Sequence, residues 1–343
     1  MLSYTTGSRP PDSIALGDFN NDNQLDVAVA LHRGHNMAVF LGYENGTLAA
    51  PTLFPTGSNP WGIIAVDFNN DNRLDIAVAN GFENNVGILL GYGNGSFTKQ
   101  IALSTDLDPW MFAVGDLNND NQLDVAVVNY ASNTMGVFLG YGNGSFSDQS
   151  TFPTDTNPPS IAVGDFNNDG RLDIAVTNLQ SNNIGIFLGY GNGTFAAQAT
   201  FATGTKPSCI AVADFNHDSQ LDIVVTNGPD NTMSVHLGYG NGTFATQTIF
   251  STGNNPQWVV VGDLNLDNHS DVIVANHDSD SVSVFLGYGD GIFAAQVTFP
   301  AGKEPYAVAV ADLNNDNRQD IAVANNGDNT VGILFNTCTC GAP

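Results

Sequence analysis

The stretch Asp165-Phe166-Asn167-Asn168-Asp169-Gly170-Arg171-Leu172-Asp173 decides the fold of this chain. Its acidic and amide side chains occupy positions 1, 3, 5 and 9, and a hydrophobic residue occupies position 8. Ca²⁺ takes about six to eight oxygen ligands. A tightly coiled loop can supply them from these side chains and from the backbone carbonyl of position 7. The stretch therefore predicts a calcium-binding loop.

The same nonapeptide recurs in strict register along the whole chain. Each copy begins 49 residues after the previous one, and seven units of 49 residues make up the 343-residue length. The loops span residues 18–26, 67–75, 116–124, 165–173, 214–222, 263–271 and 312–320. A fixed period of this size indicates a repeat architecture. We predict one domain, residues 1–343, built from seven equivalent units.

The predicted calcium ligands are positions 1, 3, 5, 7 and 9 of every loop. They are Asp18, Asn20, Asp22, Gln24, Asp26, Asp67, Asn69, Asp71, Arg73, Asp75, Asp116, Asn118, Asp120, Gln122, Asp124, Asp165, Asn167, Asp169, Arg171, Asp173, Asp214, Asn216, Asp218, Gln220, Asp222, Asp263, Asn265, Asp267, His269, Asp271, Asp312, Asn314, Asp316, Arg318 and Asp320. Three carboxylates in nine residues repel one another unless a cation or protons intervene. Seven similar, complete ligand sets favour up to seven structural Ca²⁺ ions over one catalytic centre. The alternative is a loop of Asx turns without metal.

One unit predicts four strands. In the fourth unit these are residues 161–164, 172–178, 184–190 and 194–201. An Asn-Gly pair at residues 192–193 predicts a two-residue type I′ hairpin between the last two. No segment has a helical period. Four antiparallel strands repeated in this way are typical of a propeller blade, so we predict an all-β, seven-bladed β-propeller.

The two ends of the chain predict how the ring closes. Residues 330–335 match a third strand and residues 2–7 match a fourth, so the N-terminal strand should complete the last blade. A proline precedes every loop by seven residues and should mark entry to the first strand, where a missing N–H costs little. These prolines are Pro11, Pro60, Pro109, Pro158, Pro207, Pro256 and Pro305.

With their Asp loops, Gly-Tyr-Gly-Asn-Gly turns and four-strand units, all 343 residues resemble the FG-GAP repeat family of integrin α-subunit propellers and many secreted proteins. The resemblance implies Ca²⁺ bound between the first two strands of a blade. Two features differ from integrin-type repeats. Position 3 is Asn in every loop instead of the usual Asp, which implies weaker binding. All seven units carry the loop, whereas integrins have it in only some blades.

The chain is strongly acidic, with 34 acidic and 8 basic residues and a net charge of −26. Three Asp per loop account for 21 of those acids, so most of the acidity belongs to the predicted metal sites. No Lys/Arg cluster is present to neutralise phosphate, which argues against nucleic acid as a partner. No run of about 20 apolar residues could insert into a membrane.

We predict an extracellular location, as a secreted protein or an ectodomain. Loops without obvious affinity tuning suit the millimolar Ca²⁺ found outside cells. The start at Met1 lacks the charged and apolar regions of a signal peptide, so none is present in this chain. Cys209 lies in an apolar strand and should be a buried hydrophobic residue. Cys338 and Cys340 could form a local disulfide, pair elsewhere or stay unpaired.

Four aromatic residues follow the strand-entry prolines: Trp61, Trp110, Trp258 and Tyr306. They should lie at the end of the ring opposite the Asp loops. An exposed ring of aromatic side chains could bind a sugar or a protein loop, or the same side chains could simply cap the channel. The position after the proline varies among the units, while most other positions are nearly identical. A specific binding face is expected where the repeat rule is relaxed.

Six N-glycosylation sequons are present, at Asn45, Asn94, Asn143, Asn192, Asn241 and Asn268. Five of them coincide with the Asn-Gly turns, so the turn alone could explain them. No Ser/His/Asp or paired-Glu arrangement stands apart from the repeats, and we predict no catalytic residues.

The sequence favours a non-enzymatic, calcium-stabilised extracellular propeller that acts as an adhesion or recognition module for a protein or glycan. One alternative is a lectin with sugar sites between the blades, as in the fungal lectins that the resemblance implies. Another is the propeller domain of a larger secreted enzyme. The oligomeric state stays open.

Overall fold

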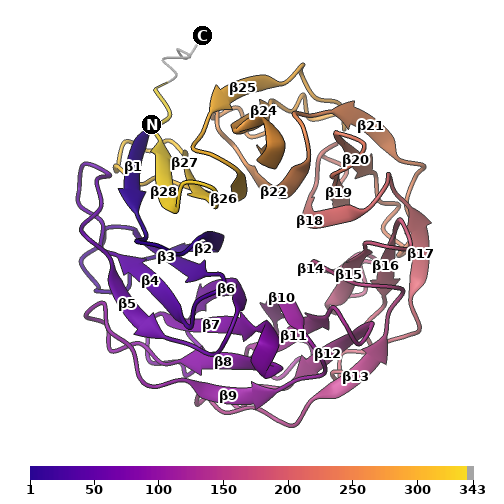
Figure 1. Cartoon of the computed structure of the whole chain (residues 1–343). Coiled ribbons are helices and arrows are strands. Elements are labelled where there is room, and N and C mark those ends of the chain that lie inside the picture. The colour runs from indigo at the N-terminus through magenta and orange to yellow at the C-terminus, as the bar shows by residue number, and fades with distance from the viewer. Residues whose placement is uncertain (338–343) are drawn as a thin grey trace.

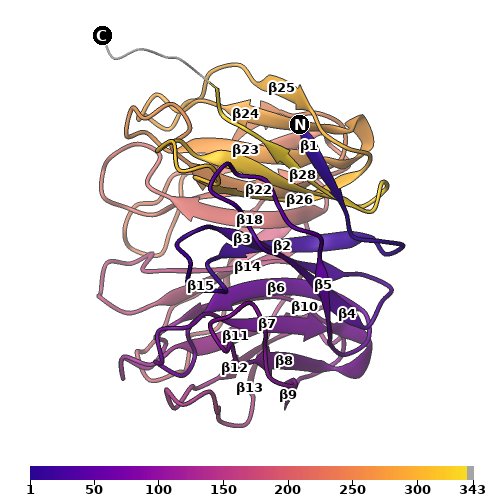
Figure 2. The same cartoon turned by 90° about the vertical axis from the view of Figure 1, so that its left-hand side faces the viewer.

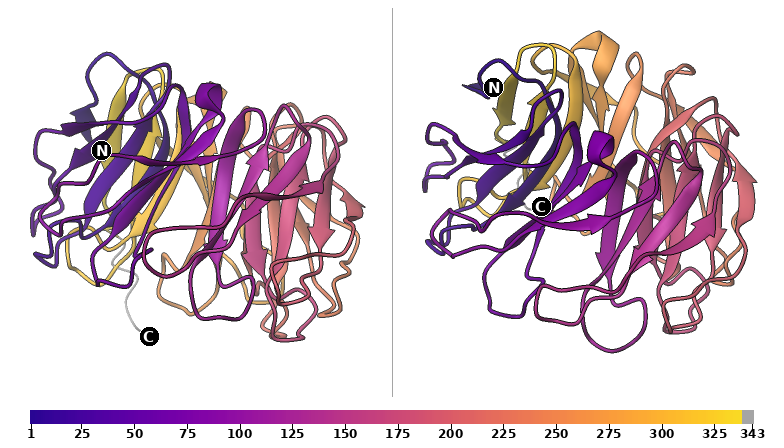
Figure 3. Two further views of the ribbon diagram at one scale, coloured as in Figure 1. Left: turned by 90° about the horizontal axis from the view of Figure 1, so that it is seen from below. Right: turned by 60° about the horizontal axis from the view of Figure 1, so that its bottom comes forward.

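The computed structural model describes residues 1–337, and these form a closed ring of seven four-stranded antiparallel sheets (Figure 1). Each sheet is one blade, and the first strand of every blade lies nearest the central axis. The side view in Figure 2 and the views from below in Figure 3 show the blades packed face to face around that axis. The predicted seven-bladed β-propeller is confirmed.

The blade boundaries follow the 49-residue repeat. The first four blades contain β2 (Pro11–Gly17), β3 (Asp26–Leu31), β4 (Asn36–Phe40) and β5 (Thr52–Pro55); β6 (Pro60–Val66), β7 (Asp75–Asn80), β8 (Asn85–Leu89) and β9 (Ile101–Ser104); β10 (Pro109–Gly115), β11 (Asp124–Asn129), β12 (Thr134–Phe138) and β13 (Ser150–Pro153); and β14 (Ile161–Gly164), β15 (Asp173–Asn178), β16 (Asn183–Phe187) and β17 (Ala199–Ala202). The last three contain β18 (Pro207–Ala213), β19 (Asp222–Asn227), β20 (Thr232–His236) and β21 (Thr248–Ser251); β22 (Pro256–Gly262), β23 (Asp271–Asn276), β24 (Ser281–Phe285) and β25 (Val297–Pro300); and β26 (Pro305–Ala311), β27 (Asp320–Asn325), β28 (Thr330–Leu334) and β1 (Leu2–Thr5). Short 3₁₀ turns, η1 (Gly81–Glu83) and η2 (His277–Ser279), follow β7 and β23.

The ring closes through the N-terminal strand. β1 pairs antiparallel with β28, from Leu2 opposite Ile333 to Thr5 opposite Thr330. The seventh blade is therefore assembled from both ends of the chain, as the sequence predicts. This pairing covers the edge of β28 that would otherwise be open to intermolecular strand pairing.

The connection between the third and fourth strands differs from the predicted two-residue hairpin. In the fourth blade, Tyr190 N donates to Thr194 O at 2.9 Å, and a single bridge pairs Gly189 with Phe195. The positive-φ residues are Gly191 and Gly193, not Asn192. Asn192 instead uses its side-chain oxygen to accept from the Thr194 backbone N–H at 3.1 Å. This Asx turn widens the loop, so β17 begins five residues later than expected.

The strand-entry prolines behave as predicted in six blades and differently in the fourth. Six of the seven first strands begin at the proline itself and contain seven residues, whereas β14 begins at Ile161 and contains four. The fourth blade has two consecutive prolines, Pro158 and Pro159. Neither has an N–H to donate to the ladder, so pairing starts only after them.

The core lies between neighbouring blades. The second strand of every blade is buried over its whole length, as in β3 and β7. Alanines of β3, such as Ala28 and Ala30, pack against Ile63, Ile76 and Val78 of the next blade. Each blade therefore stabilises the next, as expected for a repeat array.

One core position in the fifth blade carries a histidine. His236 is 1% exposed and ends β20, where the other six blades have Phe or Leu. Within residues 1–337, neither ring nitrogen meets a partner at hydrogen-bond geometry. Burial lowers the pKa of His236 to about 4, with an opposing contribution from the Ala245 backbone. The neutral imidazole is thus buried at a cost in polar desolvation.

Replacing this histidine should stabilise the ring. We expect His236→Phe to increase the free energy of unfolding by about 1–3 kcal/mol, because it removes a desolvated polar group. The folded-state pKa of His236 lies below its unfolded value of about 6.5. As the pH falls from 6.5 toward 4, the unfolded chain binds a proton that the folded chain does not, so the fold loses stability. Above pH 6.5 this loss is absent. The advantage of the variant should therefore grow between pH 6.5 and pH 4.

Thermal melts of both proteins across this pH range measure the difference. The reciprocal variant Phe187→His, at the same position of the fourth blade, should lose stability and serves as the matched control. A lower Tm for His236→Phe at neutral pH would contradict the assignment.

Candidate functional site

Each Asp loop is organised by hydrogen bonds from its own backbone. In the fourth blade, Asp165 accepts from the N–H groups of Asp169 (3.1 Å) and Gly170 (2.8 Å). Asn167 Oδ1 also accepts from Asp169 N, and Asp169 Oδ1 accepts from Arg171 N, both at 3.0 Å. The same pattern recurs in the first loop, where Asp18 accepts from the N–H groups at positions 5 and 6. These bonds hold the odd-numbered side chains around the inside of a turn.

The ninth residue of the loop has a separate role. Asp173 is fully buried, and its two oxygens accept from Phe166 N at 2.9 Å and from Gly189 N at 2.7 Å. The same two bonds occur at Asp26, Asp75, Asp124, Asp222 and Asp271. In the seventh blade, Asp320 accepts from Leu313 N and Asn336 N. This carboxyl group joins the Asp loop to the end of the third strand.

Burial is the largest influence on the pKa of these seven carboxyl groups. It raises the pKa of Asp26, Asp75, Asp124, Asp173 and Asp222 to about 6, and raises those of Asp271 and Asp320. The two backbone N–H donors oppose this effect, while the other two Asp of the same loop add to it. Each loop thus concentrates three like charges, one of them desolvated.

The donors of the loops suit a hard cation. Carboxylate, amide and carbonyl oxygens are the ligands that Ca²⁺ prefers. Within residues 1–337, however, no group of three or more His, Cys, Asp or Glu side chains is placed to hold a metal ion. The Asn167 amide instead donates to Asp169 Oδ2 at 3.2 Å. The chemistry of the donor set therefore fits Ca²⁺, and the predicted ligands stay a prediction.

Chelation should reveal whether the loops bind Ca²⁺. A cation that binds only the folded state stabilises it by about 4 kcal/mol per site at a thousandfold excess over Kd. We expect excess EGTA to lower the Tm by at least several degrees, and added Ca²⁺ to restore it. Calorimetric titration should show one fewer bound Ca²⁺ for Asp169→Asn and no change for Asp290→Asn, an exposed turn residue outside the loops. An unchanged melting curve in EGTA would refute structural calcium.

Each loop turns through two residues with positive φ, at positions 4 and 6. In the third loop these are Asn119 (φ 61°) and Asn121 (φ 63°), and Asn adopts this conformation more readily than most side chains. The sixth loop has Leu266 at position 4, with φ 62° and 57% of its surface exposed. An exposed leucine in a left-handed conformation is a local strain, because its Cβ lies too close to the following carbonyl oxygen.

Relieving this strain should stabilise the sixth loop. Leu266→Asn is expected to increase the free energy of unfolding by about 1 kcal/mol, the lower end of the cost of the left-handed conformation for a side chain with Cβ. The matched control Asn119→Leu introduces the same strain in the third loop and should lose about as much. Chemical denaturation of the three proteins measures both differences, and a loss of stability in Leu266→Asn would contradict this account.

The four predicted aromatic residues lie at the opposite end of the ring from the Asp loops. Trp61, Trp110 and Tyr306 are the second residues of β6, β10 and β26, and Trp258 is the third residue of β22. In all four strands the pairing register shifts close to the proline. Such an irregularity bends the strand and redirects its side chains. Trp61, Trp110, Trp258 and Tyr306 consequently line one cavity at the mouth of the central channel.

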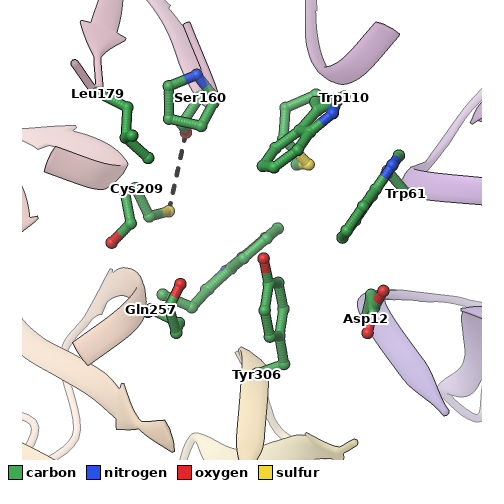
Figure 4. A pocket seen from close by; sticks show the side chains of 12 residues that line it. Asp12, Trp61, Trp110, Ser160, Leu179, Cys209, Gln257 and Tyr306 are labelled. Atoms are coloured by element: carbon green, nitrogen blue, oxygen red, sulfur yellow. Dashed lines mark hydrogen bonds between the residues drawn. The ribbon is translucent and has the colours of Figure 1, made fainter. Parts of the chain in front are cut away.

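The side chains of Trp61, Trp110 and Tyr306 lie together in this cavity, as Figure 4 shows, and the first two stack on each other. The ring centroids of Trp61 and Trp110 are 4.5 Å apart with planes inclined by 22°, and Tyr306 lies 6.5 Å from Trp61. Trp258 packs against three of the core clusters. All four are half-buried rather than fully exposed. The structure thus brings the four together in the way expected of a channel cap, and their role in ligand binding stays a prediction.

The rest of the mouth divides into an acidic side and a small-residue side. Asp12 is 2% exposed and pairs with His32, whose Nδ1 lies 2.9 Å from Asp12 Oδ2. Asn326 donates to the other oxygen of Asp12. Ser160 and Cys209 line the opposite wall. The enclosed space is about 50 Å³, enough for a few water molecules. A larger ligand would therefore contact the outer surface of the rings.

Sequence reasoning missed two aromatic contributors, Tyr130 and His32. Tyr130 stacks on Trp110 with centroids 4.0 Å apart and planes inclined by 7°, and His32 lies 4.2 Å from the Trp61 ring. Both residues directly follow a second strand, at a position that also varies among the units. Variation between repeats at this second position was the signal that could have found them.

The hydrogen bonds of Trp110 connect the mouth to the adjoining loop. Trp110 Nε1 donates to Asp108 Oδ2 at 3.0 Å. Burial raises the pKa of Asp108, and this bond opposes the increase. Burial also raises the pKa values of Tyr130 and Tyr306, with Asp108 and Asp12 respectively adding to the effect. Both phenols are therefore neutral at physiological pH, and the mouth presents neutral aromatic surfaces beside a carboxylate.

The remaining sequence predictions fall outside this mouth. Asn45, Asn94, Asn143, Asn192, Asn241 and Asn268 are all exposed, on the side of the Asp loops, and their glycosylation stays a prediction. Cys209 is buried with a free thiol, as expected. Cys338 and Cys340 lie outside the described residues. No helix within residues 1–337 is long and apolar enough to cross a membrane.

The fold is shared with solved structures of several functions. BBS1N in complex with ARL6DN is 14% identical, over 99% of this chain and 98% of that chain, with a TM-score of 0.68. A lectin from Agrocybe aegerita that recognises non-reducing terminal N-acetylglucosamine is 16% identical, over 85% and 80%, with a TM-score of 0.62. Virginiamycin B lyase from Staphylococcus aureus is 15% identical, over 97% of both chains, with a TM-score of 0.65. At these identities the likeness shows the fold alone.

Sequence comparison is more specific. No curated protein matches the chain. The model of the FG-GAP-like repeat matches six overlapping segments, residues 18–78, 67–127, 120–176, 165–225, 220–274 and 263–323. Because these segments together span residues 18 to 323, the chain belongs to the FG-GAP-like repeat family.

Proposed function

We propose that this propeller is a non-enzymatic recognition module that binds an extracellular protein or glycan at its aromatic mouth. One observation carries the proposal: Trp61, Trp110, Trp258 and Tyr306 meet where the repeats differ most. The Asp loops, by contrast, are nearly identical in all seven blades. A site that distinguishes one ligand from others needs residues that the repeat does not fix.

The chemistry of the mouth suits a partner with an amphipathic surface. Half-buried tryptophan and tyrosine rings offer large apolar faces, and such residues dominate the binding energy of many interfaces. Because the enclosed space is small, the ligand would rest on the outer faces of the rings rather than enter the channel.

In this proposal Ca²⁺ is structural and occupies the Asp loops. The side chains at positions 1, 3, 5 and 9 and the carbonyl at position 7 would hold it. Its charge would offset the repulsion among the three carboxylates of each loop. Loss of the ion would weaken the ring and affect ligand binding only indirectly, because the loops and the aromatic mouth lie at opposite ends of the blades.

A lectin is the second candidate. Flat aromatic faces stack on the apolar faces of sugars, and the similar fold of the Agrocybe aegerita lectin, at 16% identity, is compatible with this role. That lectin's ligand does not carry over at this distance. A role as the propeller domain of a secreted enzyme has no comparable support among the described residues.

Substitution of the stacked tryptophans tests the proposal. We expect Trp61→Ala combined with Trp110→Ala to weaken binding at least tenfold to any ligand found on a glycan array or a panel of extracellular-matrix proteins. Tyr190→Ala is the matched control, because Tyr190 is an aromatic residue that is 56% exposed at the other end of the blades. Circular dichroism of both variants checks the fold.

The outcomes separate the candidates. Glycan binding that depends on the tryptophans would support the lectin, and protein binding with a flat glycan array would support an adhesion module. Binding that survives the loss of both tryptophans but fails in Tyr190→Ala would overturn the assignment of the mouth.

A further inference from the structure

Six of the seven grooves between neighbouring blades are filled in the same way. In these six blades, the loop after the third strand inserts one hydrophobic residue into the groove shared with the preceding blade. The inserted residues are Leu48, Phe97, Phe146, Phe195, Phe244 and Phe293. Five of the six are 6–8% exposed, so the groove is sealed from water.

The sixth blade illustrates the contacts. The Phe293 ring lies 5.4 Å from Phe215 and 5.4 Å from Phe250, with planes inclined by 72° and 88°. Phe215 belongs to the Asp loop of the fifth blade, and Phe250 belongs to its outer strand. Two residues before the inserted ring, Gly291 N donates to Phe215 O at 2.9 Å. Each of the five grooves filled by a phenylalanine therefore combines one inserted aromatic ring with one backbone hydrogen bond. The groove filled by Leu48 differs, because Gly46 N donates to Tyr43 O of its own loop.

The groove between the sixth and seventh blades has no such insertion within residues 1–337. The residues equivalent to Phe215 and Phe250 are Leu264 and Phe299. Phe299 is 41% exposed, and β25 is exposed along its whole length, whereas the other outer strands have one half-buried residue in the middle. A hollow of about 450 Å³ lies here, lined mainly by apolar residues such as Leu264, Leu286, Phe299, Leu334 and Phe335.

This hollow adjoins the end of the pairing between β1 and β28. β1 pairs with β28 only as far as Ile333, and the backbone of Leu334 and Phe335 extends past the end of that pairing. The described chain then reaches the hollow at Thr337. The Leu264 carbonyl, equivalent to the Phe215 acceptor, takes a bond from Asn336 Nδ2 at 2.7 Å and has a second lone pair.

The next residues of the sequence are a poor match to the loop that fills the other grooves. In register with the repeat, Cys338 and Cys340 stand where the sixth blade has Gly289 (φ 73°) and Gly291 (φ 79°). A residue with Cβ is disfavoured at such angles. Ala342 stands where that blade has Phe293, and its methyl group cannot replace an aromatic ring. The sequence of this segment therefore lacks the Gly-X-Gly-X-Phe pattern of the filled grooves.

We propose that the groove between the sixth and seventh blades binds a peptide segment of a second polypeptide that carries a Gly-X-Gly-X-Phe sequence. Its phenylalanine ring occupies the space between Leu264 and Phe299, and a glycine N–H donates to the Leu264 carbonyl. The five grooves filled by a phenylalanine define this ligand, since they show which side chain and which backbone bond complete the same surface. The inference is independent of the aromatic mouth.

A peptide taken from the chain itself tests the proposal. The probe is a fluorescein-labelled peptide with the sequence of residues 189–201, titrated with the intact chain and followed by anisotropy. We expect saturable binding, and at least tenfold weaker binding for the peptide that carries Phe195→Ala. Val297→Arg in the groove should abolish binding, since Val297 is an exposed residue of its wall. Ile101→Arg, at the equivalent exposed position beside a filled groove, should leave binding unchanged.

A chain that lacks residues 338–343 distinguishes the remaining possibility. Equal binding to the intact and shortened chains supports a site open to a second polypeptide. Binding only to the shortened chain would show that the C-terminal segment occupies the groove, and this would overturn the proposal. No saturable binding to either chain, or equal affinity for the Phe195→Ala peptide, would overturn it as well.

Discussion

The structure depends on one buried carboxyl group per blade. The ninth residue of each Asp loop is removed from water, and such a group is tolerated only when its oxygens accept hydrogen bonds. Asp173 accepts one bond from the loop and one from the end of the third strand. The start of the Asp loop, the start of the second strand and the end of the third strand are thereby held together. In the seventh blade Asp320 makes the equivalent bond to Asn336, so the arrangement does not require glycine at that position.

The sequence predicts the fold because one repeat contains all the necessary information. The 49-residue period, the prolines and the matching ends specify seven blades and the pairing of β1 with β28. Local chemistry explains the misses: Asn192 caps its own turn instead of forming a type I′ pair, and Pro159 shortens β14. The four aromatic residues of the mouth could be grouped by repeat position. Their stacking with Tyr130 and His32 depends on register irregularities, which one sequence does not reveal.

The two ends of the blades are subject to different constraints. At the Asp-loop end, loops contact the next blade, as where Asn70 donates to Gln122 at 2.7 Å, so a change in one unit disturbs its neighbour. At the other end, the residue after each proline lines the cavity at the mouth of the channel. Asp12, Trp61, Ser208 and Gln257 differ while their strands keep seven residues, whereas Pro159 shortens β14. This separation lets the ring keep its stability while one face diversifies.

Closure by β1 also fixes when the molecule becomes complete. Leu2 and Ile333 are partners although almost the whole chain separates them, whereas the other blades pair strands within one repeat. Six blades can thus form in order during synthesis, each from a continuous segment. β1 is made first and stays an unpaired strand until β28 has been synthesised, a period in which exposed edges invite misassembly. β1 is therefore synthesised before the other strands of the ring and is the last of them to pair.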